Sequence, residues 1–223
     1  MLYTLRDVLG DQWVARVFTA DNGAHGNDVS VILTDELPPA DLRQQLATAA
    51  PEPATVFVAG DRTTVRIHNR KLERQFAGHP LLGTAAVLRE LGLAPTTLAT
   101  SAGVVRVWTD HNQEWLHAPA GWSPNNRHRQ VPTVAEVESL RGPPADEPVQ
   151  VWSWLDESAG LVRARMFAPS EGKPEDEASG SASMVLAVAL GRDLTVVHGQ
   201  GSVIHARPRG AGVNLGGRCV VLD

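Results

Sequence analysis

Short runs in which apolar and polar residues alternate dominate the chain, and this period of two is typical of strands with one buried face. Residues 62–68 are the clearest case, because Val65 and Ile67 alternate with polar residues after a turn-forming Asp61. The pattern predicts strands at residues 13–19, 28–34, 55–59, 63–68, 104–109, 149–154 and 161–167. The tail, residues 194–222, predicts three or four further strands separated by glycine-containing turns.

Three stretches have the pattern of helices. Residues 39–49 are amphipathic and predict an exposed helix. Residues 84–91 and 181–190 are apolar on most sides, and a helix of that kind must be buried on every face. A curved sheet wrapped around such a short helix would provide this burial.

Two segments resemble each other and predict two similar lobes. Each contains Arg-x-Phe-Ala, at 74–77 and 165–168, then a loop, a Gly-Thr/Ser-Ala step at 83–85 and 180–182, and an apolar helix. The proline-rich stretch between them contains a short helical candidate at 134–140 and is interpreted as a crossover. We therefore expect an N-terminal lobe of residues 1–120, a crossover of residues 121–148 and a C-terminal lobe of residues 149–223.

Composition excludes several classes of protein. The 223 residues carry 20 Lys and Arg against 25 Asp and Glu, and the net charge of −5 argues against a nucleic-acid partner. The longest apolar stretch, residues 184–190, is far shorter than the ~20 residues of a membrane span, and residues 1–7 lack the features of a signal peptide. A single cysteine, Cys219, rules out an internal disulfide, and the histidines lack the spacing of metal ligands. We expect a soluble, cytoplasmic protein with no metal and no membrane contact.

The starts of the two apolar helices are the candidate sites for chemistry. The first turn of a helix has unpaired backbone N–H groups at the positive end of the helix dipole, and glycine lets a ligand approach them. The two predicted starts are formed by Gly83 and Thr84 and by Gly180 and Ser181. With His79 and Asp176 beside them, a pseudo-twofold arrangement of the lobes would hold a small anionic carboxylate between the two starts. Ordinary capping is the better explanation of either helix start taken singly.

At these residues the chain resembles the PhzF-type phenazine biosynthesis isomerases. Residues 76–88, Phe-Ala-Gly-His-Pro-Leu-Leu-Gly-Thr-Ala-Ala-Val-Leu, resemble the first signature of that family. Residues 175–182, Glu-Asp-Glu-Ala-Ser-Gly-Ser-Ala, resemble its second signature, which is usually Glu-Asp-Pro-Ala-Thr-Gly-Ser-Ala. A Gly-Asn turn at 26–27 and the glycine-rich closing strands also match, so the motifs recur in family order from about residue 13 to the end.

The resemblance implies an α+β, two-lobed diaminopimelate-epimerase-like fold, with an antiparallel barrel-like sheet around a central helix in each lobe and the active site between them. It also implies a homodimer without a cofactor, acting as an isomerase or epimerase that moves protons on a small carboxylic acid. Carried over by position, His79 and Asp176 polarise the substrate and assist proton transfer. The substrate-binding positions would be Asn27, Gly78, Gly83, Thr84, Gly180 and Ser181. His25, in the turn before Asn27, is a further candidate.

One departure from the family pattern puts the chemistry in doubt. Ala54 stands where the resemblance implies the proton-shuttling glutamate, and Glu52 lies two residues earlier, a shift of roughly 6–7 Å along a strand. Glu177 replaces the usual proline of the second signature, and adjacent carboxylates tend to raise one another's pKa. Glu52, Glu177 or a group on the substrate would have to replace the missing glutamate.

Three hypotheses follow. The first is a PhzF-like, cofactor-independent isomerase or epimerase in which His79 and Asp176 carry out acid–base chemistry. The second is a non-catalytic protein that binds a small carboxylate on the same fold and has lost the reaction at Ala54. The third is a scaffold or homodimer component without a ligand.

Overall fold

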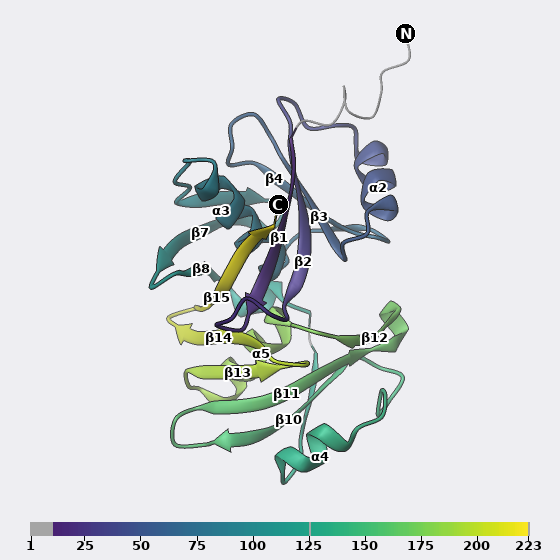
Figure 1. The fold of residues 1–223 in the computed structure, drawn as a ribbon, viewed down its shortest axis with the longest axis vertical. Helices are drawn as coiled ribbons and strands as arrows, with labels where there is room; N and C mark the ends of the chain where they lie inside the picture. The colour runs from purple at the N-terminus through teal and green to yellow at the C-terminus, as the bar shows by residue number, and fades with distance from the viewer. Residues whose placement is uncertain (1–10, 125, 223) are drawn as a thin grey trace. The chain divides into compact units, whose positions relative to one another are not determined.

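Strands make up most of the regular structure of the chain, which the computed structural model describes for residues 11–124 and 126–222 (Figure 1). The N-terminal residues used above to argue against a signal peptide lie outside these described residues. The contacts divide the chain into two units. Unit 1 contains residues 11–17, Asn27–Leu116 and 219–222, and unit 2 contains Phe18–Gly26 and His117–Arg218. Each unit therefore takes segments from both ends of the chain.

The sheet of unit 1 is built from five strands that lie side by side in the order β5-β4-β3-β2-β1. Their bounds are Glu73–Arg74 for β5, Val65–Asn69 for β4, Ala54–Val58 for β3, Asn27–Leu33 for β2 and Gln12–Thr19 for β1. Neighbours are antiparallel except β2 and β3, which are parallel. Strands β6 (Thr97–Thr100), β7 (Gly103–Asp110) and β8 (Gln113–Ala118) pair in sequence order.

Two helices cover opposite faces of this sheet. Helix α3 (Gly78–Glu90) packs on the face that presents Val29 and Val17, because a Cβ added at Gly83 would meet both side chains. Successive residues of a strand point to opposite faces, so Ser30 belongs to the other face. Ser30 is in register with Thr55, and Thr55 with His68, whose ring contacts helix α2 (Ala40–Ala49). Helix α2 therefore covers the Ser30 face.

Helix α2 is largely exposed, as its amphipathic pattern predicts, and a buried arginine holds it on the sheet. Arg43 is 9% exposed and donates to His68 Nε2 at 3.2 Å, to Glu73 Oε2 at 3.1 Å and to the Pro38 carbonyl at 2.6 Å. The Nε2 of His68 must accept, so Nδ1 carries the proton and donates to Gln44 Oε1 at 3.0 Å. Burial of the ring lowers the pKa of His68.

The strands of unit 2 lie in the order β15-β14-β13-β11-β10-β9, and β12 pairs with β11. Their bounds are Gly212–Leu222 for β15, Ser202–Arg209 for β14, Leu194–His198 for β13, Leu161–Ala168 for β11, Val149–Asp156 for β10, Arg127–Gln130 for β9 and Lys173–Asp176 for β12. Strands β11 and β13 are parallel, as are β10 and β9, and the other pairs are antiparallel.

The helices of unit 2 also take opposite faces of their sheet. Helix α5 (Gly180–Leu190) packs on the face of β11 that presents Met166 and Ala168, through Ala182. Helix α4 (Val134–Ser139) packs on the other face, where Val137 contacts Phe167 in a core cluster. The remaining regular elements in the described residues are the 3₁₀ turns η1 (Ala120–Trp122) and η2 (Pro169–Glu171).

The alternation pattern predicted the main strands, and all the strands that it placed are present. It missed the short strands β5, β6, β8, β9 and β12, of which β9 lies inside the expected crossover. The prediction that a helix begins at residue 84 is wrong, because α3 begins at Gly78. The Gly-His-Pro sequence looks like a turn, but proline lacks an N–H and is tolerated in the first turn of a helix, where that group has no partner.

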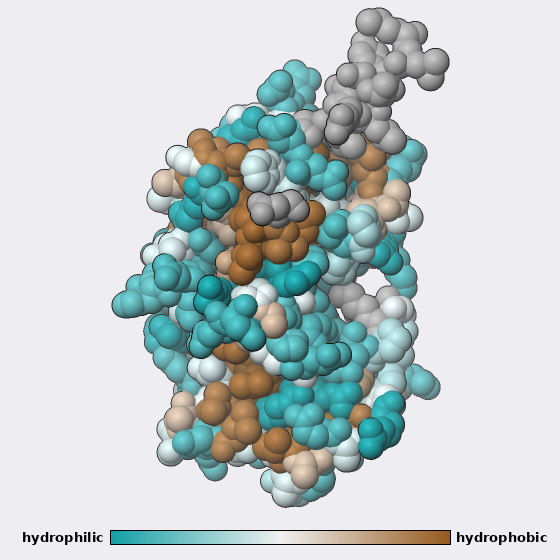
Figure 2. Space-filling model, viewed as in Figure 1, coloured by the Kyte–Doolittle hydropathy of each residue, from teal (hydrophilic) through white to brown (hydrophobic). Residues whose placement is uncertain are grey.

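Large apolar side chains are exposed at separate positions in the described residues, namely Leu72, Leu91, Leu93, Val104, Leu155 and Val188. Figure 2 shows hydrophobic patches on the viewed face that are interrupted by hydrophilic atoms. Within the described ranges, no helix has the length and apolar character needed to span a membrane.

Gly83 allows the closest contact between α3 and its sheet, and this generates a prediction. A Cβ at Gly83 would lie 2.4 Å from Val29 Cγ1 and 3.0 Å from Val17 Cγ2. Overpacking of this kind costs about 1–3 kcal/mol, against a gain of up to ~1 kcal/mol in helix propensity. We expect Gly83→Ala to lower the free energy of unfolding by about 1–2 kcal/mol in urea titrations.

Gly121→Ala is the matched control, because a Cβ there meets nothing within 4 Å. Equal stability of the Gly83→Ala protein and the wild type would contradict the packing of α3 described above.

Candidate functional site

The start of α3 places His79 in the first helical turn of unit 1. The preceding residue, Ala77, is extended and makes no side-chain capping bond to the helix. This helix therefore begins without the side-chain oxygen that usually accepts from the first N–H groups. His79, the second helical residue, is half-buried next to the buried Gly78. A predicted catalytic residue and a predicted binding residue thus lie together at a helix N-terminus.

Gly83 and Thr84 do not lie at that start, which corrects their placement by the sequence. Both are in the interior of α3, where Gly83 packs against the sheet. The Thr84 side chain is fully buried, and its hydroxyl donates to the Pro80 carbonyl at 2.8 Å. In this structure, Gly83 thus allows α3 to pack closely on the sheet, and the Thr84 hydroxyl forms a hydrogen bond within the helix.

The start of α5 lies where the sequence predicted it, with Gly180 as the first helical residue and Ser181 as the second. Ser179 caps the helix through a bond from the Ala182 N–H of 3.4 Å, so capping is present at this end. Gly180 also has a packing role, because a Cβ there would lie 3.1 Å from Phe18 Cζ. The hydroxyl of Ser181 lies in the first turn beside these groups.

Asn126 is a polar residue of this site that sequence reasoning missed. Its side-chain amide donates to Ser181 Oγ at 3.5 Å, and the residue is 8% exposed. It lies in the polar cluster before β9. A polar cluster predicts a solvent-exposed crossover, so the sequence does not indicate that Asn126 is buried. Asn126 and Ser181 provide neutral hydrogen-bonding groups next to a helix N-terminus, an environment suited to a carboxylate.

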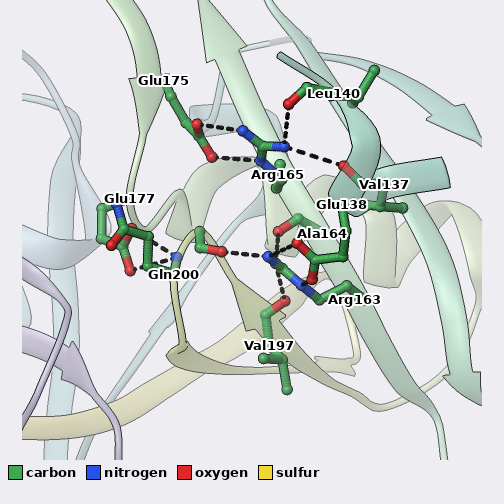
Figure 3. A network of polar contacts seen from close by, with 11 residues as sticks. Val137, Glu138, Leu140, Arg163, Ala164, Arg165, Glu175, Glu177, Val197 and Gln200 are labelled. Carbon is green, nitrogen blue, oxygen red and sulfur yellow. Dashed lines mark hydrogen bonds and ion pairs between the residues drawn. The ribbon is translucent and has the colours of Figure 1, made fainter. Parts of the chain in front are cut away.

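Asp176 ends β12 at the middle of three consecutive acidic residues, and its neighbours have fixed partners (Figure 3). Glu175 forms a two-bond ion pair with Arg165, at 2.8 and 2.7 Å. The Glu177 carboxylate accepts from the Gln200 N–H at 3.0 and 2.9 Å and from the Ser202 hydroxyl at 2.7 Å. The two outer acids are therefore committed to the protein, and Asp176 is the half-buried acid between them.

His198 lies fully buried near this acidic segment. Its Nδ1 is 2.8 Å from the Glu177 carbonyl, which can only accept, so Nδ1 carries the proton. Burial lowers the pKa of His198, and the charge of Asp176 acts in the opposite direction. The ring is therefore neutral at pH 7.

Ala54 and Glu52 are directed to opposite faces of the unit 1 sheet. Ala54 precedes Thr55 by one residue in β3, so it shares the α3 face with Val29, and it is 5% exposed. The Glu52 carboxylate instead accepts from the Ser30 hydroxyl at 2.8 Å, on the α2 face. Glu52 thus does not place its carboxylate where a side chain at position 54 would point.

The turn before β2 holds Asn27 and His25. Asn27 is the first residue of β2 and is in register with Val17. His25 has a φ of 64°, and a Cβ added at Gly201 would lie 2.8 Å from its ring. The Gly26 N–H donates to Ser202 Oγ at 2.8 Å. The structure thus packs His25 on the β13–β14 turn, and its role toward a ligand stays a prediction. In the part of the chain that is described, no cluster of three His, Cys, Asp or Glu residues could hold a metal ion.

Solved structures define the class of fold. The chain matches a phenazine biosynthesis PhzC/PhzF protein from Clostridium difficile with a TM-score of 0.77 at 19% identity, covering 95% of this chain and 96% of that one. It also matches a hydroxyproline epimerase from Agrobacterium vitis, with a TM-score of 0.66 at 12% identity over 99% of this chain and 92% of that one. The protein therefore has the α+β, diaminopimelate-epimerase-like fold.

Sequence comparisons show which family the chain resembles. Residues 15–122 match the family model of phenazine biosynthesis-like proteins, PhzC-PhzF. A trans-2,3-dihydro-3-hydroxyanthranilate isomerase from Pseudomonas fluorescens is 29% identical over 144 residues, which is 62% of this chain and 43% of that enzyme. The match thus spans less than half of the length of this curated relative. The chain is thus similar to PhzF-type proteins in both sequence and structure, and the resemblance seen in its motifs is confirmed.

The buried His198 makes stability depend on pH. An unfolded histidine titrates near pH 6.5, whereas His198 in the folded protein has a lowered pKa. As the pH falls below about 6.5, the unfolded chain binds the proton first and the folded state loses stability, by up to about 1.4 kcal/mol per pH unit for each such group. Burial lowers the pKa of three further histidines in the same direction, His68, His128 and His205.

We expect the free energy of unfolding of the wild type to fall between pH 7.5 and 5.5, and His198→Asn to fall less steeply. The asparagine amide can still donate to the Glu177 carbonyl but does not titrate. Urea titrations at several pH values measure both slopes. Identical slopes for the two proteins would show that His198 does not contribute.

Proposed function

We propose that this PhzF-like protein is an isomerase or epimerase that moves a proton on a small carboxylic acid, with His79 and Asp176 as its acid–base groups. The observation that carries the proposal is the pair of helix starts: His79 in the first turn of an uncapped α3, and Asp176 just before α5 with Ser181 and Asn126. The family match supports the reaction class, since its curated relative is named an isomerase.

The chemistry of the helix starts supports a carboxylate as the bound group. Each start combines backbone N–H groups with the positive end of a helix dipole, which favours an anion. At α5 the hydroxyl of Ser181 and the amide of Asn126 add neutral donors that do not repel a negative charge. Such donors would hold the carboxylate of the acid and stabilise negative charge that develops on it when a proton leaves.

His79 and Asp176 are the titratable residues to which we assign proton transfer. A histidine exchanges protons near neutral pH, and a carboxylate accepts one and returns it to another position of the substrate. Glu52 and Glu177 are not needed for this scheme, because their carboxylates are bonded to Ser30 and to the β13–β14 turn. We propose that His79 and Asp176 each transfer a proton in this reaction.

The second candidate is a non-catalytic carboxylate-binding protein, and Ala54 is the observation that favours it. A methyl group stands at the position implied for the family's proton-shuttling glutamate, and Glu52 lies on the other face of the sheet. Loss of one general acid or base typically lowers a rate 10²–10⁴-fold. A protein of this kind would bind the acid without exchanging its protons.

Proton exchange on a defined probe tests the proposed reaction. We expect the wild type to introduce deuterium from D₂O into trans-2,3-dihydro-3-hydroxyanthranilate, followed by NMR and mass spectrometry. His79→Ala and Asp176→Asn should each reduce the rate by about 10²-fold or more, because each removes one acid–base group.

His111→Ala and Asp35→Asn are matched controls at exposed positions, and we expect both to keep the wild-type rate. Binding of the probe without deuterium exchange would favour the non-catalytic candidate. Full exchange in both the His79→Ala and the Asp176→Asn proteins would refute the assigned roles.

Restoring a carboxylate at position 54 tests what its absence costs. We expect Ala54→Glu to raise the rate of deuterium exchange at least tenfold over Ala54→Gln, which has the same size but cannot transfer a proton. Thermal unfolding of both variants controls for the burial of a polar side chain at this site. Equal rates for the two variants would show that position 54 does not limit the reaction.

A further inference from the structure

Glu177 is held at both its backbone and its side chain by one turn of unit 2, residues 199–201 between β13 and β14. His198, just before the turn, donates to the Glu177 carbonyl at 2.8 Å. The Glu177 carboxylate accepts from the Gln200 N–H and from the hydroxyl of Ser202, just after the turn. These contacts fix the residue that follows Asp176 relative to the sheet.

The turn itself is fixed from the other face of the sheet (Figure 3). Arg163 is buried on the α4 face, where it pairs with Glu138 at 2.6 Å and donates to the carbonyls of Val197 and Gly199. The turn also fits tightly around Glu177, because a Cβ added at Gly199 would lie 2.3 Å from the Glu177 carbonyl oxygen. Arg163 thus bonds the turn from one face of the sheet, and the turn packs closely around Glu177.

Asp176 is fixed on its other side by Glu175. The guanidinium of Arg165 binds the Glu175 carboxylate and also donates to the Val137 and Leu140 carbonyls, at 3.2 and 2.8 Å. Asp176 thus lies between two residues whose side chains are tied to different parts of unit 2. Glu177 is the neighbour of Asp176 that lies between it and the start of α5 at Gly180.

The contacts of Glu177 continue to the turn before Asn27. Ser202 donates to Glu177 and accepts from the Gly26 N–H at 2.8 Å, and His25 packs on Gly201. One carboxylate therefore orders the backbone next to Asp176 and, through one hydroxyl, the backbone next to Asn27.

We propose that Glu177 is a positioning residue. It holds Asp176 in place for proton transfer and does not itself exchange a proton. This inference rests on the proposed function. The resembled motif has proline at this position, which restricts the backbone through its ring. In this chain, the hydrogen bonds of Glu177 with the 199–201 turn replace that covalent restriction.

The first test needs no substrate and is made by NMR on the full chain. In Glu177→Gln, we expect the Gln200 amide to exchange with solvent at least tenfold faster and the order parameter of the Asp176 amide to fall. In Glu177→Pro, we expect order at Asp176 to be restored while Gln200 stays unprotected. Glu157→Gln, the same change at an exposed turn of unit 2, should alter neither.

An unchanged order parameter at Asp176 in Glu177→Gln, with faster exchange at Gln200, would overturn the inference, because Glu177 would then hold only the turn. Ser202→Ala provides a second route if the proline variant does not fold. In Ser202→Ala, the Gly26 amide should exchange with solvent faster. An unchanged exchange rate at Gly26 would contradict the proposed link to Asn27.

The second test uses deuterium exchange into trans-2,3-dihydro-3-hydroxyanthranilate. We expect Glu177→Gln to lower kcat/KM at least tenfold and Glu177→Pro to recover it to within threefold of the wild type. A proline variant as slow as Glu177→Gln would mean that the carboxylate itself takes part, which overturns a positioning role. Absence of exchange in the wild type would refute the proposed function alone, since the NMR measurements still decide the inference.

Discussion

Close approach of a buried helix to a sheet is the constraint on which the rest of this structure depends. Helices α3 and α5 are apolar on nearly all sides and are stable only when covered. Gly83 brings α3 against Val29 and Val17, and Gly180 brings α5 against Phe18. Because the helices are fixed by these contacts, their first turns are fixed as well. His79 and Ser181 thus owe their positions to the close packing that these two glycines allow.

This packing explains which parts of the site the sequence could and could not predict. Alternating residues located the main strands, and uniform apolarity marked both buried helices, because these patterns record burial directly. The start of α3 was misplaced because Gly83 looks like a boundary, whereas the reason for glycine is a neighbour that is distant in sequence. Asn126 was missed for a related reason: its burial against Ser181 depends on tertiary contacts, and a polar cluster gives no local sign of them.

The acidic residues also show what the sequence alone could not predict, and these residues bear on function. By sequence alone, Glu52, Glu177 and a group on the substrate were the candidates to replace the glutamate absent at Ala54. The structure gives the two carboxylates different hydrogen-bond partners. A bond from Ser30 holds the Glu52 carboxylate on the α2 face, and the Glu177 carboxylate accepts hydrogen bonds from Gln200 and Ser202 around the 199–201 turn. Hydrogen-bond partners and sheet faces, which no motif contains, decide what a carboxylate can do.

The assignment of residues 18–26 to unit 2 has a consequence for how the chain acquires its structure. Phe18 packs against Gly180 and Gly217, and the Gly26 N–H bonds to Ser202, a residue 176 positions later. Contacts of such long sequence separation are costly in chain entropy and are formed late in folding. During synthesis, the first segment of unit 2 leaves the ribosome long before the residues that receive it. Unit 2 therefore completes its core only after Ser202 and Gly217 have been made.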